Sequence, residues 1–301
     1  MIGAIIGDIV GSTREFNNVN NYDFELFPEN SEFTDDTILT IATAKALLDG
    51  NDNFEKYYYE FGNKYKHPLG GYGGRFSEWL NLDKNNLKTY NSYGNGCLSR
   101  LSPIFTGNID FNKQLKLAKK SVYCTHNSVL GGFYSTKLIE IAQYIKKSKY
   151  DFHKELEKSV LNPDNYFYKD YLNKFDETCK ILPICLKLYY ESTSFEDCLR
   201  RSVIIGGDSD TIAAITCSLA ELDNNMIIPK WIIKKTMSFL PKEFIDIIKD
   251  YYKTFNYYYT DKKILFEENN ENFSEKEAKD HIEIIDDLIK KNYIYDIVKD
   301  L

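Results

Sequence analysis

The sequence has few of the residues that bind transition metals or form disulfides. It contains four histidines, and no two of its six cysteines have the C-x-x-C spacing of a zinc or redox site. Most of the cysteines lie within apolar helical segments, which is typical of reduced, buried thiols. We therefore expect a cytoplasmic protein. The scarcity of histidine also disfavours a phosphohydrolase that binds its metal ions through several histidines.

Excess positive charge and long apolar runs are missing as well. Lysine and arginine number 38 against 45 aspartates and glutamates, a net charge of −7, and the lysines are scattered among acids. Such a field disfavours nucleic acid and anionic membranes as partners. The apolar start from Met1 to Gly11 is short, contains Asp8 and has no basic leader, unlike a signal peptide or a membrane span. We expect a monomer that binds neither nucleic acid nor a membrane.

Sustained alternation of apolar and polar residues, the pattern of a half-buried strand, is not found. Apolar residues recur instead at helical spacing, and a chain of 301 residues is at the upper end of single-domain size. An all-α single domain is therefore predicted. The predicted helices cover residues 38–50, 115–122, 130–145, 181–190, 212–219 and 244–251.

The composition changes near the C-terminus. Residues 267–279 are acidic and polar with almost no apolar side chains, and residues 282–289 carry an amphipathic stripe. We therefore predict a catalytic domain over residues 1–260, followed by a polar linker and helical tail over residues 261–301.

Two short segments have the same design, with carboxylates and a threonine hydroxyl at the start of an apolar helix. They are Thr34-Asp35-Asp36-Thr37 and Gly207-Asp208-Ser209-Asp210-Thr211. Asp, Ser and Thr are preferred N-cap residues and acids suit the first turn, so helix capping explains either segment alone. One cap needs only one acceptor, however, and each segment carries two acids among apolar neighbours. This excess favours a ligand site.

If the two helix starts meet, four carboxylates share one small volume. Two like charges about 4 Å apart repel by about 4 kcal/mol at an effective dielectric constant near 20. Such a cluster needs raised pKa values or bound cations. Because all the donor atoms are oxygens, the expected cation is a hard one such as Mg²⁺ or Mn²⁺.

The two acidic segments resemble the metal-binding signatures of the ADP-ribosylglycohydrolase family, which includes the dinitrogenase reductase-activating glycohydrolases. Four further matches follow the family's order: Gly7-Asp8-Ile9-Val10-Gly11 in its first helix, the loop Gly71-Tyr72-Gly73, the substrate loop Ser92-Tyr93-Gly94-Asn95-Gly96 with Arg100, and Thr125-His126-Asn127 at the adenosine end of the pocket. The matches span residue 1 to about residue 222. Each match alone is weak, but six in the correct order are specific.

The resemblance implies a compact orthogonal helical bundle that recognises ADP-ribose and binds two Mg²⁺ or Mn²⁺ ions. The metal ligands that it implies are Thr34, Asp35, Asp36, Asp208, Asp210 and Thr211. The loop that would wrap the diphosphate with backbone N–H groups consists of Ser92, Tyr93, Gly94, Asn95, Gly96 and Cys97. His126 would pack against the adenosine, although a lone histidine is more often a core or helix-start residue.

The segment Ser12-Thr13-Arg14-Glu15 resembles a stretch in the serine-directed branch of the family, in which a glutamate gates the metal site. Glu15 could equally be an exposed acid beyond a helix end. Two departures concern specificity. Many bacterial members have Ala-Met before the loop arginine and His-Pro-Glu after the Thr-His-Asn segment, whereas this chain has Leu98-Ser99 and residues 128–130 are Ser-Val-Leu. Neither change affects an expected metal ligand, but both affect the region that would set specificity.

We expect a metal-dependent hydrolase that cleaves the glycosidic bond between ADP-ribose and a protein side chain. Its attacking water would lose a proton to Asp35 or Asp36, between which the sequence does not decide. Alternatives are a hydrolase of a free ADP-ribose conjugate or another nucleoside diphosphate sugar, an inactive ADP-ribose-binding protein, and a structural protein of the same fold. The complete set of acids disfavours the two inactive alternatives. Glu15 slightly favours a linkage to serine or to another O-linked acceptor.

Overall fold

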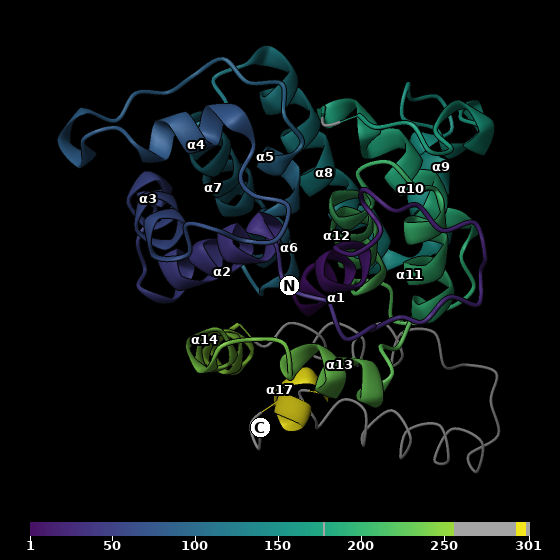
Figure 1. Cartoon of the computed structure of the whole chain (residues 1–301). Helices are drawn as coiled ribbons and strands as arrows, with labels where there is room; N and C mark the ends of the chain where they lie inside the picture. The colour runs from purple at the N-terminus through teal and green to yellow at the C-terminus, as the bar shows by residue number, and fades with distance from the viewer. Residues whose placement is uncertain (177, 256–292, 299–301) are drawn as a thin grey trace, which may run out of the picture.

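A computed structural model of the chain describes residues 1–176, 178–255 and 293–298, and this part is helical (Figure 1). Within it, β pairing is limited to two isolated bridges, Tyr90 with His126 and Gly94 with Thr178. The predicted all-α class is confirmed. The α-helices are α1 (Ile2–Gly11), α2 (Asp35–Leu48), α3 (Phe54–Lys64), α4 (Gly74–Leu80), α5 (Gly96–Ser99), α6 (Ser102–Thr106), α7 (Phe111–Tyr123), α8 (Val129–Lys147), α9 (Lys149–Leu156), α10 (Leu182–Glu191), α11 (Phe195–Ile204), α12 (Ser209–Ala220), α13 (Lys230–Met237), α14 (Lys242–Thr254) and α17 (Tyr293–Val298).

Helices α1 and α12 form the centre of the molecule, and every residue of both is buried. Three glycines on one face of α1 allow the two backbones to touch. A Cβ atom at Gly3 would lie 2.3 Å from the carbonyl oxygen of Cys217, and one at Gly7 would lie 2.2 Å from that of Ala213. At Gly11 it would lie 2.4 Å from the Cα of Asp210. We call this contact the glycine seam; no other residue type fits there without separating the helices.

The other helices surround this central pair (Figure 1). Helix α2 packs on α1, with α3 and α14 against its outer side, while α10 and α11 pack on α12. Helices α7 and α8 pack together, and the short α5 lies between them and α12. This arrangement brings the first turns of α2 and α12 next to α5, although the three helices are far apart in the sequence.

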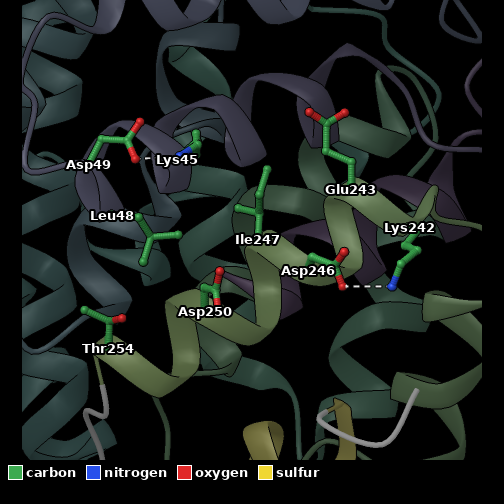
Figure 2. Close-up of a pocket in the computed structure, with 9 residues that line it drawn as sticks. All are labelled: Lys45, Leu48, Asp49, Lys242, Glu243, Asp246, Ile247, Asp250 and Thr254. Carbon is green, nitrogen blue, oxygen red and sulfur yellow. Dashed lines mark hydrogen bonds and ion pairs between the residues drawn. The ribbon is translucent and has the colours of Figure 1, made fainter.

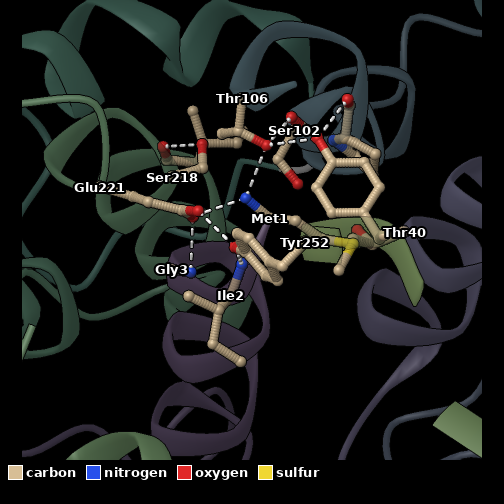
Figure 3. A network of polar contacts seen from close by, with 12 residues as sticks. Met1, Ile2, Gly3, Thr40, Ser102, Thr106, Ser218, Glu221 and Tyr252 are labelled. Carbon is tan, nitrogen blue, oxygen red and sulfur yellow. Dashed lines mark hydrogen bonds and ion pairs between the residues drawn. The ribbon is translucent and has the colours of Figure 1, made fainter. Parts of the chain in front are cut away.

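The amino end of α1 is fixed by a buried polar network (Figure 3). The ammonium group of Met1 forms an ion pair of 2.5 Å with Glu221 and donates a hydrogen bond of 2.9 Å to Thr106. Glu221 also accepts hydrogen bonds from the N–H of Gly3 at 2.8 Å and from the hydroxyl of Tyr252 at 2.5 Å. The network joins the start of α1 to the end of α12 and to α14.

The six helices predicted from apolar spacing correspond to α2, α7, α8, α10, α12 and α14. The stripe at residues 282–289 and the predicted boundary at residue 260 lie outside the described residues. Nearer the end of the chain, α17 packs on α13 and α14, with Ile294, Ile297 and Val298 buried. Among the described helices none has both the length and the apolar character needed to cross a membrane.

Candidate active site

Asp8 on α1 organises the first turn of α2. This carboxylate is completely buried and accepts hydrogen bonds from the backbone N–H of Thr34 at 3.0 Å and of Thr37 at 3.1 Å. The hydroxyls of the same two threonines also donate to it. Thr34 in turn caps α2 by accepting from the N–H of Asp36 at 3.3 Å. Asp8 therefore sets the position from which Asp35 and Asp36 project.

The first turns of α2 and α12 meet at Asp36. One carboxylate oxygen of Asp36 accepts a hydrogen bond of 2.7 Å from the hydroxyl of Thr211 on α12. The other oxygen accepts from the hydroxyl of Ser99 on α5. The sequence predicted that the two acidic helix starts would come together, and this contact confirms it.

A left-handed turn positions the acids of α12. Gly206 and Gly207 have φ values of 73° and 69°, which favour glycine. A Cβ at Gly207 would lie 2.2 Å from the backbone oxygen of Lys174, so this position also lacks space for a side chain. Asp208 follows at the N-cap of α12 but makes no capping hydrogen bond there. Capping therefore accounts for Thr34 but not for Asp208.

Glu15 joins the acids of α12. Carboxylate oxygens of Glu15, Asp208 and Asp210 all lie within 4.8 Å of one another, close enough to share a cation. Glu15 also lies beside the loop of Gly70, where a Cβ atom would be 3.2 Å from its Oε2. The structure thus places Glu15 at the acid cluster and not on an open surface.

Burial and mutual repulsion raise the pKa values of these acids. Burial is the main cause of a pKa near 6 for Asp208 and near 7 for Asp8, and the charge of Asp36 adds to both. Asp35 and Asp210 have pKa values well above the usual range for the same two reasons. The pKa of Asp36 is raised by burial and is opposed by its hydrogen bonds and by Arg100. Glu15, Asp208 and Asp210 thus form a group of acids that could hold a metal ion, and carboxylate oxygens suit a hard cation.

The glycine-containing loop from Ser92 to Cys97 lies against this cluster. The side-chain amide of Asn95 donates to Asp208. The hydroxyl of Ser92 accepts from the N–H of Gly94 at 3.1 Å, and the carbonyl of Tyr93 accepts from the N–H of Cys179 at 2.9 Å. The thiol of Cys97 is buried and donates to the carbonyl of Gly94 at 3.3 Å. Helix α5 begins at Gly96 and places Ser99 beside Asp36.

His126 lies beside Gly94 of the same loop. A Cβ atom at Gly94 would be 3.2 Å from its Nε2, and its ring is 5.7 Å from that of Tyr90. Burial and then the charge of Arg100 lower the pKa of His126 to about 3, so the ring is neutral in the folded protein. Arg100 donates to Thr125, whose hydroxyl is also 2.9 Å from Nδ1 of His126. The loop therefore connects the acid cluster to a neutral imidazole.

A hollow of about 670 Å³ lies elsewhere (Figure 2). It is lined by the end of α2 and by residues of α14, the last of which is Thr254. The acids of α2 are at the opposite end of that helix, about 20 Å away at 1.5 Å per residue. Two ion pairs lie within its lining, Asp49 with Lys45 and Asp246 with Lys242. This mixed-charge surface hollow is not the candidate site.

Three residues of the site received no role from the sequence. Asp8 was noted only as an interruption of an apolar segment and as part of a motif, yet a buried acid in such a segment already indicates a buried partner. Ser99 was seen only as a departure from the family pattern. Asn18, which accepts from the N–H of Gly207 at 3.1 Å, has no sequence signal because its neighbours are polar.

Comparison with known proteins agrees with this geometry. The family model described as ADP-ribosylglycohydrolase matches residues 1–220, which end with α12 and include every candidate residue. A solved structure titled "ADP-ribosylglycohydrolase-related protein complex" is similar in fold, with a TM-score of 0.64 and 19% identity over 84% of this chain and 95% of that chain. No curated protein matches the sequence. The chain therefore belongs to the ADP-ribosylglycohydrolase family, a family of hydrolases.

Proposed function

We propose that this protein is a metal-dependent hydrolase that cleaves the glycosidic bond between ADP-ribose and a protein side chain. The observation that supports this proposal most directly is the convergence of α2 and α12. It gathers the acids of both helices beside a glycine-containing loop, joined through Asp36 to Thr211 and through Asp208 to Asn95. A cation site next to a loop of accessible backbone fits a substrate with ribose hydroxyls and a diphosphate.

The donor atoms fit two hard divalent cations, Mg²⁺ or Mn²⁺. They are carboxylate and hydroxyl oxygens, and no cysteine or histidine is among them. The raised pKa values indicate negative charge that is poorly compensated by the described residues. Such ions, when bound, act as Lewis acids that lower the pKa of water and neutralise developing charge. The proposed ligands are Thr34, Asp35, Asp36, Asp208, Asp210 and Thr211.

The substrate would lie along the loop, with the diphosphate against the backbone from Ser92 to Cys97 and the adenosine near His126. A neutral imidazole beside the ring of Tyr90 offers an uncharged, partly aromatic surface, which suits a purine. The scissile bond would then lie at the acid cluster, beyond Asn95.

Asp35 is the better candidate for the general base. Both oxygens of Asp36 already accept hydrogen bonds, from Ser99 and Thr211. Asp35 is half-buried, and burial raises its pKa, so it accepts a proton more readily than an ordinary aspartate. Glu15 would act as a gate, because it combines a position in the acid cluster with a place on the loop after α1.

The test is release of ADP-ribose from arginine-modified and serine-modified protein, with Mg²⁺ or Mn²⁺ and with a chelator. We expect release that the chelator abolishes and that the Asp210→Asn variant lacks. Release that is unaffected by the chelator would contradict metal dependence. If wild-type protein binds ADP-ribose in calorimetry without releasing it, the protein is a binding module. If it cleaves only small ADP-ribose conjugates, the substrate is a free conjugate and not a modified protein.

A further inference from the structure

Two exposed aromatic rings are stacked at the rim of the acid cluster. The rings of Phe16 and Phe175 have centroids 5.9 Å apart and an interplanar angle of 27°. Phe16 is 75% exposed and Phe175 is 47% exposed. Burying apolar surface favours folding, so two rings held together with this much exposure offer area that the fold itself does not use.

Contacts place this pair next to the acids. Phe16 directly follows Glu15, which is one of the three acids that could share a cation. The Cα of Phe175 would lie 3.4 Å from a Cβ at Gly207, the residue that precedes Asp208. The two rings thus come from segments that each adjoin an acid of the cluster.

The segment that carries Phe175 also reaches the glycine-containing loop. The segment that carries Phe175 runs from the Gly207 turn to Thr178, which pairs with Gly94 of the glycine-containing loop. A Cβ atom at Gly94 would lie 3.2 Å from Nε2 of His126. If the scissile bond lies at the acid cluster, the group beyond that bond is next to Phe16 and Phe175, whose segments adjoin Glu15 and Asp208.

We infer that Phe16 and Phe175 form the acceptor subsite and contact the polypeptide that carries the ADP-ribose. This inference rests on the proposed function and deepens it by naming the residues that contact the polypeptide substrate. The solvent exposure of the two rings favours a polypeptide as the substrate, because its backbone and neighbouring side chains can lie across a flat apolar surface. A free amino acid beyond the scissile bond has little surface to cover them. Aromatic residues are also those most enriched at protein recognition surfaces.

The experiment compares one linkage in two contexts, an ADP-ribosylated protein and the corresponding free ADP-ribosyl amino acid. We expect Phe16→Ala and Phe175→Ala to lower kcat/KM on the protein substrate by about tenfold, mainly through KM, the loss of about 1.4 kcal/mol of binding. Turnover of the free conjugate should stay within twofold of wild type, and Phe16→Tyr should restore the protein activity. Phe111→Ala, at an exposed ring that begins α7, is the matched control and should leave both substrates unaffected.

The outcomes separate this inference from the proposed function. Equal loss on both substrates, or no loss on either, would overturn the acceptor subsite while hydrolysis itself stands. Wild-type cleavage of the free conjugate alone would also overturn it. Absence of turnover by wild type on both substrates would refute the proposed function, and the acceptor subsite with it.

Discussion

The hydroxyl of Thr211 donates a hydrogen bond of 2.7 Å to the carboxylate of Asp36, which ties the first turn of α12 to the first turn of α2. Ser99 donates to the second oxygen of the same carboxylate, so three helices meet at one side chain. Hydrogen bonds to both oxygens fix the orientation of this carboxylate. A fixed orientation favours the binding of a cation by a carboxylate.

Loss of the Ser99 hydroxyl should weaken cation binding. In Ser99→Ala one oxygen of Asp36 loses its donor, and we expect Mn²⁺ affinity to fall by about 10- to 100-fold. Titration calorimetry, or the Mn²⁺ concentration that gives half-maximal activity, measures this. Ser135→Ala is the control, because that hydroxyl bonds only to the backbone of its own helix, at Gly132. Wild-type affinity in Ser99→Ala would show that the Ser99 hydroxyl does not support cation binding through Asp36.

The glycine seam should not accept a methyl group. In Gly7→Ala the new Cβ would lie 2.2 Å from a backbone oxygen that cannot move independently of α12. We expect destabilisation at or above the about 1–3 kcal/mol typical of overpacked cores, measured by urea unfolding. Gly74→Ala is the control, since nothing lies within 4 Å of its Cβ position in α4. Equal stability of the two variants would contradict the seam.

Acid should destabilise the protein partly through His126. Its pKa is about 3 in the folded protein and about 6.5 when unfolded. Between these values the folded protein holds fewer protons, so the free energy of unfolding rises with pH up to about 6.5 and decreases as the pH falls below it. The contribution approaches about 1.4 kcal/mol per pH unit.

His126→Gln should therefore flatten the dependence of unfolding free energy on pH between about 6 and 4. His67→Gln, the same substitution at an exposed position, is the matched control. If both variants match wild type, His126 is accessible to protons in the folded state.

Removing one partner of the ion pair between Met1 and Glu221 should destabilise the protein. Burial lowers the pKa of the Met1 ammonium group to about 6, and Glu221→Gln removes its counter-charge. We therefore expect a loss of unfolding free energy that grows as the pH falls below about 6, up to about 3–5 kcal/mol. Asp246→Asn removes an exposed partner of Lys242 and should change stability by less than about 0.5 kcal/mol. Similar effects of the two substitutions would show that the Met1 network contributes little to stability.

The sequence predicts the helices that carry a regular apolar pattern and the acids that start two of them. It could not predict α1 as the partner of α12, because a contact between glycines leaves no hydrophobic signature. The roles of Ser99 and Asn18 depend on which backbone groups face them after folding. Likewise, Phe16 and Phe175 are 159 residues apart in the chain, and their stacking is set by where α1 and the Gly207 turn end.

The glycine seam has a consequence for how the site responds to change elsewhere. Gly11 meets the backbone of Asp210, and Asp8 is one turn earlier on the same helix. The spacing between the acid that organises α2 and the acids of α12 is therefore fixed by main chain against main chain. Substitutions that alter side-chain volume in the surrounding layers can shift outer helices while this spacing stays constant. Substitutions in the rest of the core should therefore leave the geometry of the acid cluster unchanged.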